Sequence, residues 1–459
     1  MRALAAYLRT LNPSLPRSVQ TLQLGGVFNA FGNGLVLPFA FIYLHNVRGI
    51  GLGTAGLILA TNAGASMVLG PVFGSLVDRF GGRRMLSVAL GFLAVGFGLY
   101  ALVHDPWLGF VAAALTGVGN GGFWAAQSTL IAGLTTPEQR PGAYAMQRIV
   151  MNLGIGLGGV TGGFIASTSD PVTFQLLFLG NAATFVVYLG ILQAFVKEPG
   201  REQHGHDARP GRYVEVLRHR AFLGVLALNT LFIFAGISGF ELLPVYGKNE
   251  AGVSEEAIGF IYLANTLLIV AAQLPITRLC EGRRRMSVLA VMGAIWAVGW
   301  AVVPASGLWL SGTSAALLLG LAVCVFAVGE CLHGAVQGPL VADLAEPRLM
   351  GRYMALSALS WQIGFTLGPA IGGFALAFSP SGLWLGAAVI LLLGSLAALP
   401  LESTLPAAAR RSPTRTLATR AVESSMMTPI AEDPLSHAEP AQDPQDEAAV
   451  GGRRRPRTA

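Results

Sequence analysis

The chain has 459 residues, of which 53% are hydrophobic and 12% are charged, and its mean hydropathy is +0.59. A soluble domain carries about 25% charged residues, so this composition excludes a soluble globular protein and predicts an integral membrane protein. The formal net charge of +6 would suit nucleic-acid binding. However, most of the basic residues lie in short loops or in the C-terminal tail, so we expect no nucleic-acid partner.

Twelve apolar segments of about 20 residues are each long enough to cross a bilayer core of about 30 Å. They lie near residues 18–44, 50–76, 86–104, 107–134, 142–168, 172–196, 219–246, 255–278, 286–305, 308–342, 351–378 and 381–400. In lipid each segment must satisfy its own backbone amides, which predicts an all-α membrane protein. The segment 308–342 has two interpretations, one long helix or a helix with an interfacial end. The first segment lacks a signal-peptide cleavage site, and we expect an uncleaved anchor.

The basic residues are distributed unequally between the two sides of these segments. The side of the N-terminus carries twenty of them, and the opposite side carries two, Arg48 and Lys248. The positive-inside rule therefore predicts that both termini are cytoplasmic. The three cysteines, Cys280, Cys324 and Cys331, form no C-x-x-C pair, and we interpret them as buried small hydrophobes rather than metal ligands. We expect no metal and no cofactor.

The sequence also repeats itself. GGRRMLSVALGF at 81–92 aligns with GRRRMSVLAVMG at 282–293, NLGIGLGGVTGGF at 152–164 aligns with QIGFTLGPAIGGF at 362–374, and LPFAFIY at 37–43 is similar to LPVYGKN at 243–249. We therefore predict two pseudo-symmetric bundles of six helices each. Their predicted bounds are 1–196 and 219–400, with a cytoplasmic linker at 197–218 and a disordered cytoplasmic tail at 401–459, whose polar composition cannot bury a core.

The polar loop GSLVDRFGGRRM at 74–85 resembles the signature loop between helices 2 and 3 of the major facilitator superfamily of transporters. The matching positions are Gly74, Leu76, Asp78, Arg79, Gly81, Arg83 and Arg84. The resemblance implies twelve helices, a substrate site between the two halves, and a loop that latches the halves together on the cytoplasmic side. It also implies a protein that functions as a monomer. The alternative is a loop that only orients the chain. In the counterpart loop at 277–286, Leu279 replaces Asp78.

Two glycine-rich segments have a spacing of four residues, which permits close helix packing. They contribute Gly154, Gly158 and Gly162 in one half, and Gly364, Gly368 and Gly372 beside the helix-bending Pro369 in the other. These segments resemble the G-x-x-x-G-P-x-x-G-G motif of the superfamily's drug/proton antiporters. In the first segment Gly159 replaces the proline, and Ala113 replaces an arginine that this group often carries in helix 4.

Ionisable and amide side chains inside the apolar segments are candidates for substrate binding or proton coupling, because placing such groups in a membrane costs free energy. Glu330 lies near mid-membrane and aligns with Asn120, while Gln337 aligns with Gln127; the alternative for Glu330 is a hydrogen bond to a neighbouring helix. Glu241 is either a second protonatable site or a carboxylate at headgroup level. Arg148 either holds Glu330 or an anionic substrate, or extends to the interface. The remaining candidates that line the cavity are His333, Asn29 and Asn33.

The motifs of ATP-driven pumps and of common hydrolases are absent from the sequence, and we expect no enzyme. We predict a secondary active transporter of the cytoplasmic membrane that works by alternating access. It would export a hydrophobic or amphipathic small molecule in exchange for protons. Two alternatives stay open, a proton-coupled importer of a small nutrient or anion, and a non-transporting membrane sensor or scaffold.

Overall fold

The computed structural model describes residues 15–136, 139–197, 213–346 and 349–412. Within them, eleven helices are long and apolar enough to cross a membrane, and the bent pair Arg17–Val36 and Ala40–Val47 makes a twelfth span. The predicted all-α fold with twelve spans is thus confirmed. We call residues 15–197 the N half and residues 213–412 the C half.

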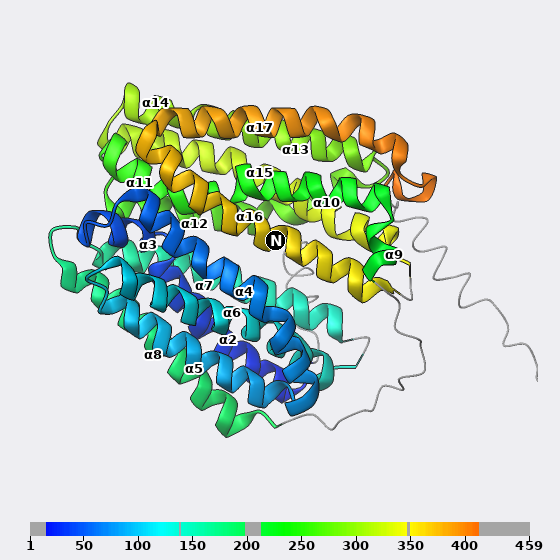
Figure 1. The fold of residues 1–459 in the computed structure, drawn as a ribbon, viewed down its shortest axis with the longest axis horizontal. Coiled ribbons are helices and arrows are strands. Elements are labelled where there is room, and N and C mark those ends of the chain that lie inside the picture. The colour runs from blue at the N-terminus through cyan, green and yellow to red at the C-terminus, as the bar shows by residue number, and fades with distance from the viewer. Residues whose placement is uncertain (1–14, 137–138, 198–212, 347–348, 413–459) are drawn as a thin grey trace, which may run out of the picture. The chain divides into compact units, whose positions relative to one another are not determined.

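The N half contains six spans in chain order (Figure 1). Its elements are α2 (Arg17–Val36), α3 (Ala40–Ile42), the π-helical turn η1 (Tyr43–Val47), α4 (Leu52–Phe80), α5 (Gly82–Ala101), α6 (Pro106–Leu134), α7 (Arg140–Ile165) and α8 (Pro171–Phe195). The first span bends by 43° between α2 and α3, at the segment that contains Pro38. A proline cannot donate the helical hydrogen bond, so a bend at this position is expected.

The C half repeats this order (Figure 1). Its elements are α9 (Tyr213–Leu217), α10 (Arg220–Phe232), the π-helical turn η2 (Ile233–Ile237), α11 (Gly239–Ala251), α12 (Glu255–Cys280), α13 (Arg285–Ala301), α14 (Val303–Leu308), α15 (Gly312–Leu344), α16 (Met350–Phe378), α17 (Pro380–Leu401), and the 3₁₀ turns η4 (Glu402–Thr404) and η5 (Ala407–Ala409). The tenth span, α15, is one continuous helix, which settles the ambiguity over 308–342.

The starts of several spans follow directly from the sequence. Asp105 accepts a hydrogen bond from the Leu108 amide at 3.0 Å, and Pro106 follows at the first helical position. Asp170 and Ser379 make the same kind of cap before a proline, and Ser254 caps α12. The side-chain oxygen of the cap accepts a hydrogen bond from a backbone amide that has no partner within the helix. Proline is tolerated at the next position because an amide there would have no helical partner either.

Each half is filled by aromatic side chains near the ends of its helices that are remote from the termini. In the N half, Tyr43 packs on Phe178 with ring centroids 4.8 Å apart. In the C half, Trp300 lies between Phe326 at 4.5 Å and Trp384 at 5.1 Å. Many apolar side chains instead point outward, for example 93% of Phe378 is exposed, as expected for a surface that faces lipid tails.

The pseudo-symmetry can be read residue by residue. The hydroxyl of Tyr43 donates to the Tyr100 carbonyl, and that of Tyr246 donates to the Val303 carbonyl, so both pairs are related by a shift of 203 residues. Gly49 and Gly252, also 203 apart, both have a left-handed backbone, with φ of 68° and 61°. The predicted alignment of 37–43 with 243–249 was therefore wrong by three positions. The shift of 210 for α6 and α15 is confirmed by Gly119 and Gly329, which are 210 residues apart and face equivalent helices. A Cβ on Gly119 would meet Leu93 of α5, and one on Gly329 would meet Trp296 of α13.

The predicted linker and tail are only partly covered by the structure. Residues 198–212 and 413–459 lie outside the described residues. Residues 213–217 form α9, whose Val216 is buried against Phe222 and Tyr353. Residues 402–412 are ordered and pack on the C half, so the predicted disorder was wrong for this stretch. Two apolar residues of this otherwise polar stretch, Leu405 and Ala409, are buried.

Candidate functional site: a polar cavity at the contact between the two halves

A polar cavity of about 260 Å³ lies between the N half and α11 of the C half. Every span of the N half contributes to its wall, and Glu241 is the single charged side chain in the lining. We call this space the polar cavity. Its other polar lining residues are Asn33, Asn62, Tyr100, Thr116 and Asn120, and its apolar walls include Phe41, Phe97 and Phe178. Apolar and aromatic walls with a few placed polar groups are typical of small-molecule sites.

The amides of the polar cavity are joined by hydrogen bonds. Asn120 donates to Asn62 Oδ1 at 3.3 Å, and Asn62 donates to Thr116 Oγ1 at 2.6 Å. On the opposite side, Asn33 donates to Asn29 Oδ1 at 3.4 Å and accepts from Asn181 at 3.5 Å. Such bonds fix the orientation of side chains in a low-dielectric interior.

Sequence reasoning found Asn29, Asn33 and Asn120, and missed Asn62 and Asn181. A single amide in an apolar segment gives no periodic signal, so its facing direction follows only from the packing of the helix. A search for every amide within the spans would have included these two residues.

Glu241 reaches the polar cavity from the C half because of the local shape of the seventh span. The π-helical turn η2 ends at Ile237, Ser238 separates it from α11, and Pro244 follows three residues after Glu241. Within the described residues, the carboxylate of Glu241 makes no hydrogen bond and no ion pair. An unpaired carboxylate is costly in a membrane interior. Such a group is stabilised by a bound proton or by a cationic ligand.

Glu330 occupies a different environment. It is half-buried in α15, and its Oε2 accepts a hydrogen bond from Asn265 Nδ2 of α12 at 2.9 Å. Arg148 is exposed on α7, and its guanidinium forms no ion pair with any carboxylate that the structure describes. Of the alternatives for Arg148, an ion pair with Glu330 is therefore not formed in this structure. Arg148 is also absent from the lining of the polar cavity.

The remaining candidates lie inside the bundles. His333 of α15 contacts Asn229 Oδ1 at 2.8 Å, and Asn229 donates to Ser360 at 2.7 Å, which joins three spans of the C half. Gln127 donates to the Tyr188 hydroxyl at 3.0 Å within the N half. Gln337 is buried, and its Nε2 has no partner among the described residues. The structure thus places these side chains between helices of one half and outside the polar cavity.

The glycine-rich segments lie at helix contacts. A Cβ on Gly154 would lie 2.5 Å from Ala30 of α2, and one on Gly364 would lie 2.6 Å from Ile233, the residue equivalent to Ala30 in the C half. The others occupy corresponding contacts: Gly158 and Gly162 against α2 and Phe39, Gly368 against Ser238 and Gly372 against Leu242. The buried Pro369 presents its carbonyl to Gly56 of α4 in the N half. Only residues without a side chain allow backbones to approach this closely.

The two halves contact each other from mid-helix to the ends of the spans remote from the chain termini. We call these ends the closed end. Asn46 donates to Asn249 Oδ1 at 2.5 Å, and these two residues are related by the shift of 203, so they lie at the pseudo-twofold axis. The Thr168 amide donates to Glu255 Oε1 at 3.1 Å, and Lys248 pairs with Glu255 Oε2 at 2.9 Å.

Further from the closed end, Gln362 of α16 donates a hydrogen bond to Ser66 of α4 at 3.1 Å. Beyond it along α4, a Cβ added to Gly70 or Gly74 would have open space around it.

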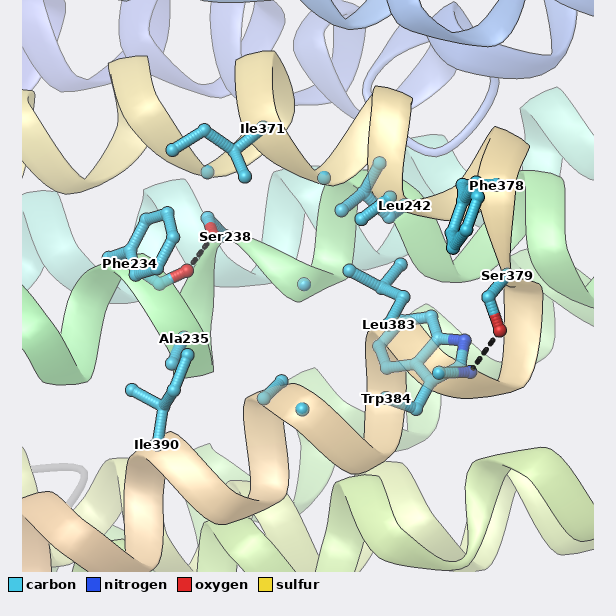
Figure 2. Close-up of a pocket in the computed structure, with 17 residues that line it drawn as sticks. Phe234, Ala235, Ser238, Leu242, Ile371, Phe378, Ser379, Leu383, Trp384 and Ile390 are labelled. Carbon is cyan, nitrogen blue, oxygen red and sulfur yellow. Dashed lines mark hydrogen bonds between the residues drawn. The ribbon is translucent and has the colours of Figure 1, made fainter.

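A second and larger cavity, of about 500 Å³, lies within the C half between η2, α11, α16 and α17. Figure 2 shows apolar side chains such as Leu242, Ile371 and Leu383 around it. Its hydroxyl groups already have partners, because Ser238 donates to the Phe234 carbonyl and Ser379 accepts from the Gly382 amide. With no ionisable group in its lining, this cavity offers no chemistry for coupling, so the polar cavity is the better candidate despite its smaller volume.

Comparison with known proteins identifies the family. The family model described as Major Facilitator Superfamily matches residues 22–329 and 242–437. The chain belongs to the Major Facilitator Superfamily. It is therefore a multi-pass membrane transporter that acts on small molecules, and not an enzyme.

Similar proteins include the multidrug resistance protein MdtH of Enterobacter sp. (strain 638), 27% identical over 375 residues, which cover 78% of this chain and 88% of that protein. The MdtH of Cronobacter sakazakii is 27% identical over 370 residues, covering 77% and 87%.

Solved structures of the same fold include a bacterial homologue of the human lysosomal transporter Spinster in an inward-facing and occupied conformation. It has a TM-score of 0.70 and 12% identity, covering 86% of this chain and 98% of that one. Another is a POT family transporter in complex with 5-aminolevulinic acid, with a TM-score of 0.70 and 12% identity, covering 84% and 96%.

The signature loop of the superfamily lies at the junction of α4 and α5. Gly81 has a φ of 91°, which lets α4 end and α5 begin within one residue. Arg83 donates to the carbonyl and Oε1 of Gln193 at the end of α8, at 2.8 Å each, so it fastens two helices of the same half. Arg84 is exposed, and Arg79 lies over the ring of Phe80. The side chain of Asp78 lies outside the described residues.

Proposed function

We propose that the chain is a proton-coupled exporter of hydrophobic or amphipathic small molecules that works by alternating access in the cytoplasmic membrane, with both termini on the cytoplasmic side. The observation that carries the proposal is Glu241, a lone carboxylate from the C half in a cavity built by the N half. The names of the relatives, multidrug resistance proteins, support export of small molecules.

The mechanism follows from the cost of an unpaired charge in a low-dielectric site. Glu241 is stabilised either by a proton or by a substrate that donates hydrogen bonds or carries positive charge. These two occupants compete for one carboxylate, so a proton entering from one side displaces the substrate to that side. The aromatic walls at Phe41, Phe97 and Phe178 would hold the apolar part of the substrate.

The distribution of basic residues supports an orientation in which the closed end faces outside, opposite the cytoplasmic termini. In this orientation the structure corresponds to a state with its outer end sealed by Asn46, Asn249 and Glu255. Export requires a second state in which these contacts break and the cytoplasmic ends close. We assign the latch of that second state to the loop from Gly74 to Arg84. Its function as a latch would be lost on substitution of Asp78 by asparagine.

Transport by purified protein in liposomes tests the role of Glu241, with ethidium as the probe. We expect Glu241→Gln to abolish ethidium transport driven by a pH gradient while ethidium exchange without a gradient persists, because only coupling requires a titratable group. Glu256→Gln, at an exposed position in the first turn of α12, is the control and should behave as wild type. Full gradient-driven transport by Glu241→Gln would overturn the assignment.

A further inference from the structure

Residues 402–412, which follow the last span, fold back onto the start of the ninth. The Gly282 amide donates to the Ser412 carbonyl at 3.0 Å, the Ser412 amide donates to the Arg283 carbonyl at 3.0 Å, and the Arg285 amide donates to the Arg410 carbonyl at 2.8 Å. Arg284 and Arg411 form an antiparallel bridge at the centre of this pairing. The chain after α17 is therefore hydrogen-bonded along the loop between α12 and α13.

Side chains extend this contact to a third helix. Arg285 is 1% exposed, and its Nη2 pairs with Asp343 near the end of α15 at 2.5 Å, while its Nη1 donates to the Ala409 carbonyl at 3.4 Å. Arg284 pairs with Glu402 at 3.2 Å. A buried guanidinium requires such partners, because an uncompensated charge is strongly destabilising. One short segment thus joins the ends of α13, α15 and α17.

The N half has no equivalent of this contact. The loop sequences align with a shift of 201, but α5 and α13 are related by a shift of 203, which pairs their first residues, Gly82 and Arg285, and also pairs Leu93 with Trp296. The enclosed Arg285 therefore takes the place of Gly82, a residue without a side chain. Arg83 holds the end of α8, much as Arg284 holds Glu402 beyond the end of α17. Arg84 is exposed, whereas Arg285 is 1% exposed and contacts both the returning segment and α15. With the shift of 203 that relates α4 to α12, Glu281 and not Leu279 takes the place of Asp78, so the alignment of Leu279 with Asp78 was wrong.

We propose that residues 402–412 are a strap that fixes the loop between α12 and α13 to α15 and α17. The strap engages the arginines of this loop, so the C half moves as one body and has no free counterpart of the signature loop. The two similar loops therefore have different roles, a strapped loop in the C half and a switching loop in the N half. Residues 413–459 are not needed for either role.

Two truncations test the strap in the full transporter background. A chain that ends after Ser412 should retain the Tm of the full protein in detergent and its rate of ethidium transport. A chain that ends after Leu401 should melt at a Tm lower by about 5 °C or more and transport at least several-fold more slowly. Equal Tm values and equal transport rates for the two truncations would overturn the proposal.

Hydrogen exchange of single amides provides a readout that does not depend on transport. In the full protein the amides of Gly282 and Arg285 should be protected, because the strap accepts their hydrogen bonds. In the chain that ends after Leu401, these two amides should exchange at least tenfold faster while amides within α15 keep their protection. If the shorter chain does not fold, Ser412→Pro in the full chain removes one strap hydrogen bond and should accelerate exchange at Gly282. Rapid exchange of these amides in the full protein would refute the strap.

Discussion

Glu255 at the closed end offers a direct test of how the sealed state is held. Its carboxylate joins the two halves, because Oε1 accepts from the Thr168 amide of the N half at 3.1 Å while Oε2 pairs with Lys248 at 2.9 Å. The ion pair lies within the C half, so the contact that distinguishes the sealed state is the hydrogen bond from Thr168. Substitution by glutamine retains an oxygen for this amide but replaces a charge-assisted hydrogen bond across the halves by a neutral one.

The magnitude follows from the hydrogen bond that crosses the halves, whose acceptor Glu255 is 10% exposed. A hydrogen bond to a charged group contributes about 1.5–3 kcal/mol and a neutral one about 0.5–1.5 kcal/mol, so we expect the sealed state to lose about 1–2 kcal/mol. Because about 1.4 kcal/mol corresponds to a tenfold change in an equilibrium constant, the ratio of sealed to open states should fall about 5- to 30-fold.

The assay is the labelling rate of Ala40→Cys, a position that lines the polar cavity, in a protein whose native cysteines are replaced by serine. A membrane-impermeant maleimide is added outside intact cells. Glu255→Gln should raise the labelling rate in proportion to the open population, by about 5- to 30-fold. The adjacent and exposed Glu256→Gln should leave the rate unchanged. An unchanged rate in Glu255→Gln would show that the charge on Glu255 does not hold the seal.

Two further predictions concern the interior of the halves. Glu330→Gln retains an oxygen for the Asn265 hydrogen bond, so the Tm of this variant should stay within about 2 °C of wild type. Loss of gradient-driven ethidium transport in this variant would make Glu330 a second coupling site. Unchanged transport would limit Glu330 to helix packing. Gly158→Ala places a methyl group against the Phe31 carbonyl and should destabilise the protein by about 1–3 kcal/mol, seen as a lower Tm. Gly190→Ala in α8 meets open space and should not lower it, so equal Tm values for these two variants would contradict the packing argument.

Hydropathy and glycine spacing were sufficient to predict the spans and the helix contacts. Each lipid-spanning segment must be a helix of at least membrane length, so the segments could be assigned without knowledge of tertiary structure. The four-residue spacing of Gly154, Gly158 and Gly162 implied one face of one helix, and the structure places that face against α2. These features depend on local sequence alone.

The position of Glu241 could not be derived in the same way. The π-helical turn η2 inserts an extra residue into the seventh span, and one residue rotates the following helix by about 100°. The facing direction of Glu241 thus depends on a local distortion that has no clear sequence signature. Leu243 and Pro244 are not equivalent to Leu37 and Pro38, although the dipeptides are identical, because the shift is 203 on both sides of η2.

The two halves share a backbone plan but differ in where they place acidic side chains. With the shift of 203, Glu241 takes the place of the buried Pro38, and Glu255 takes the place of Leu52. Glu330 takes the place of Asn120 with the shift of 210. All three carboxylates therefore belong to the C half, while the N half supplies amides and aromatic walls at the polar cavity. In the proposed mechanism the halves rock against each other on this symmetric scaffold, and the carboxylates of the C half would make the motion responsive to protons. The N half would then provide the surface against which each protonation state of the C half is stabilised.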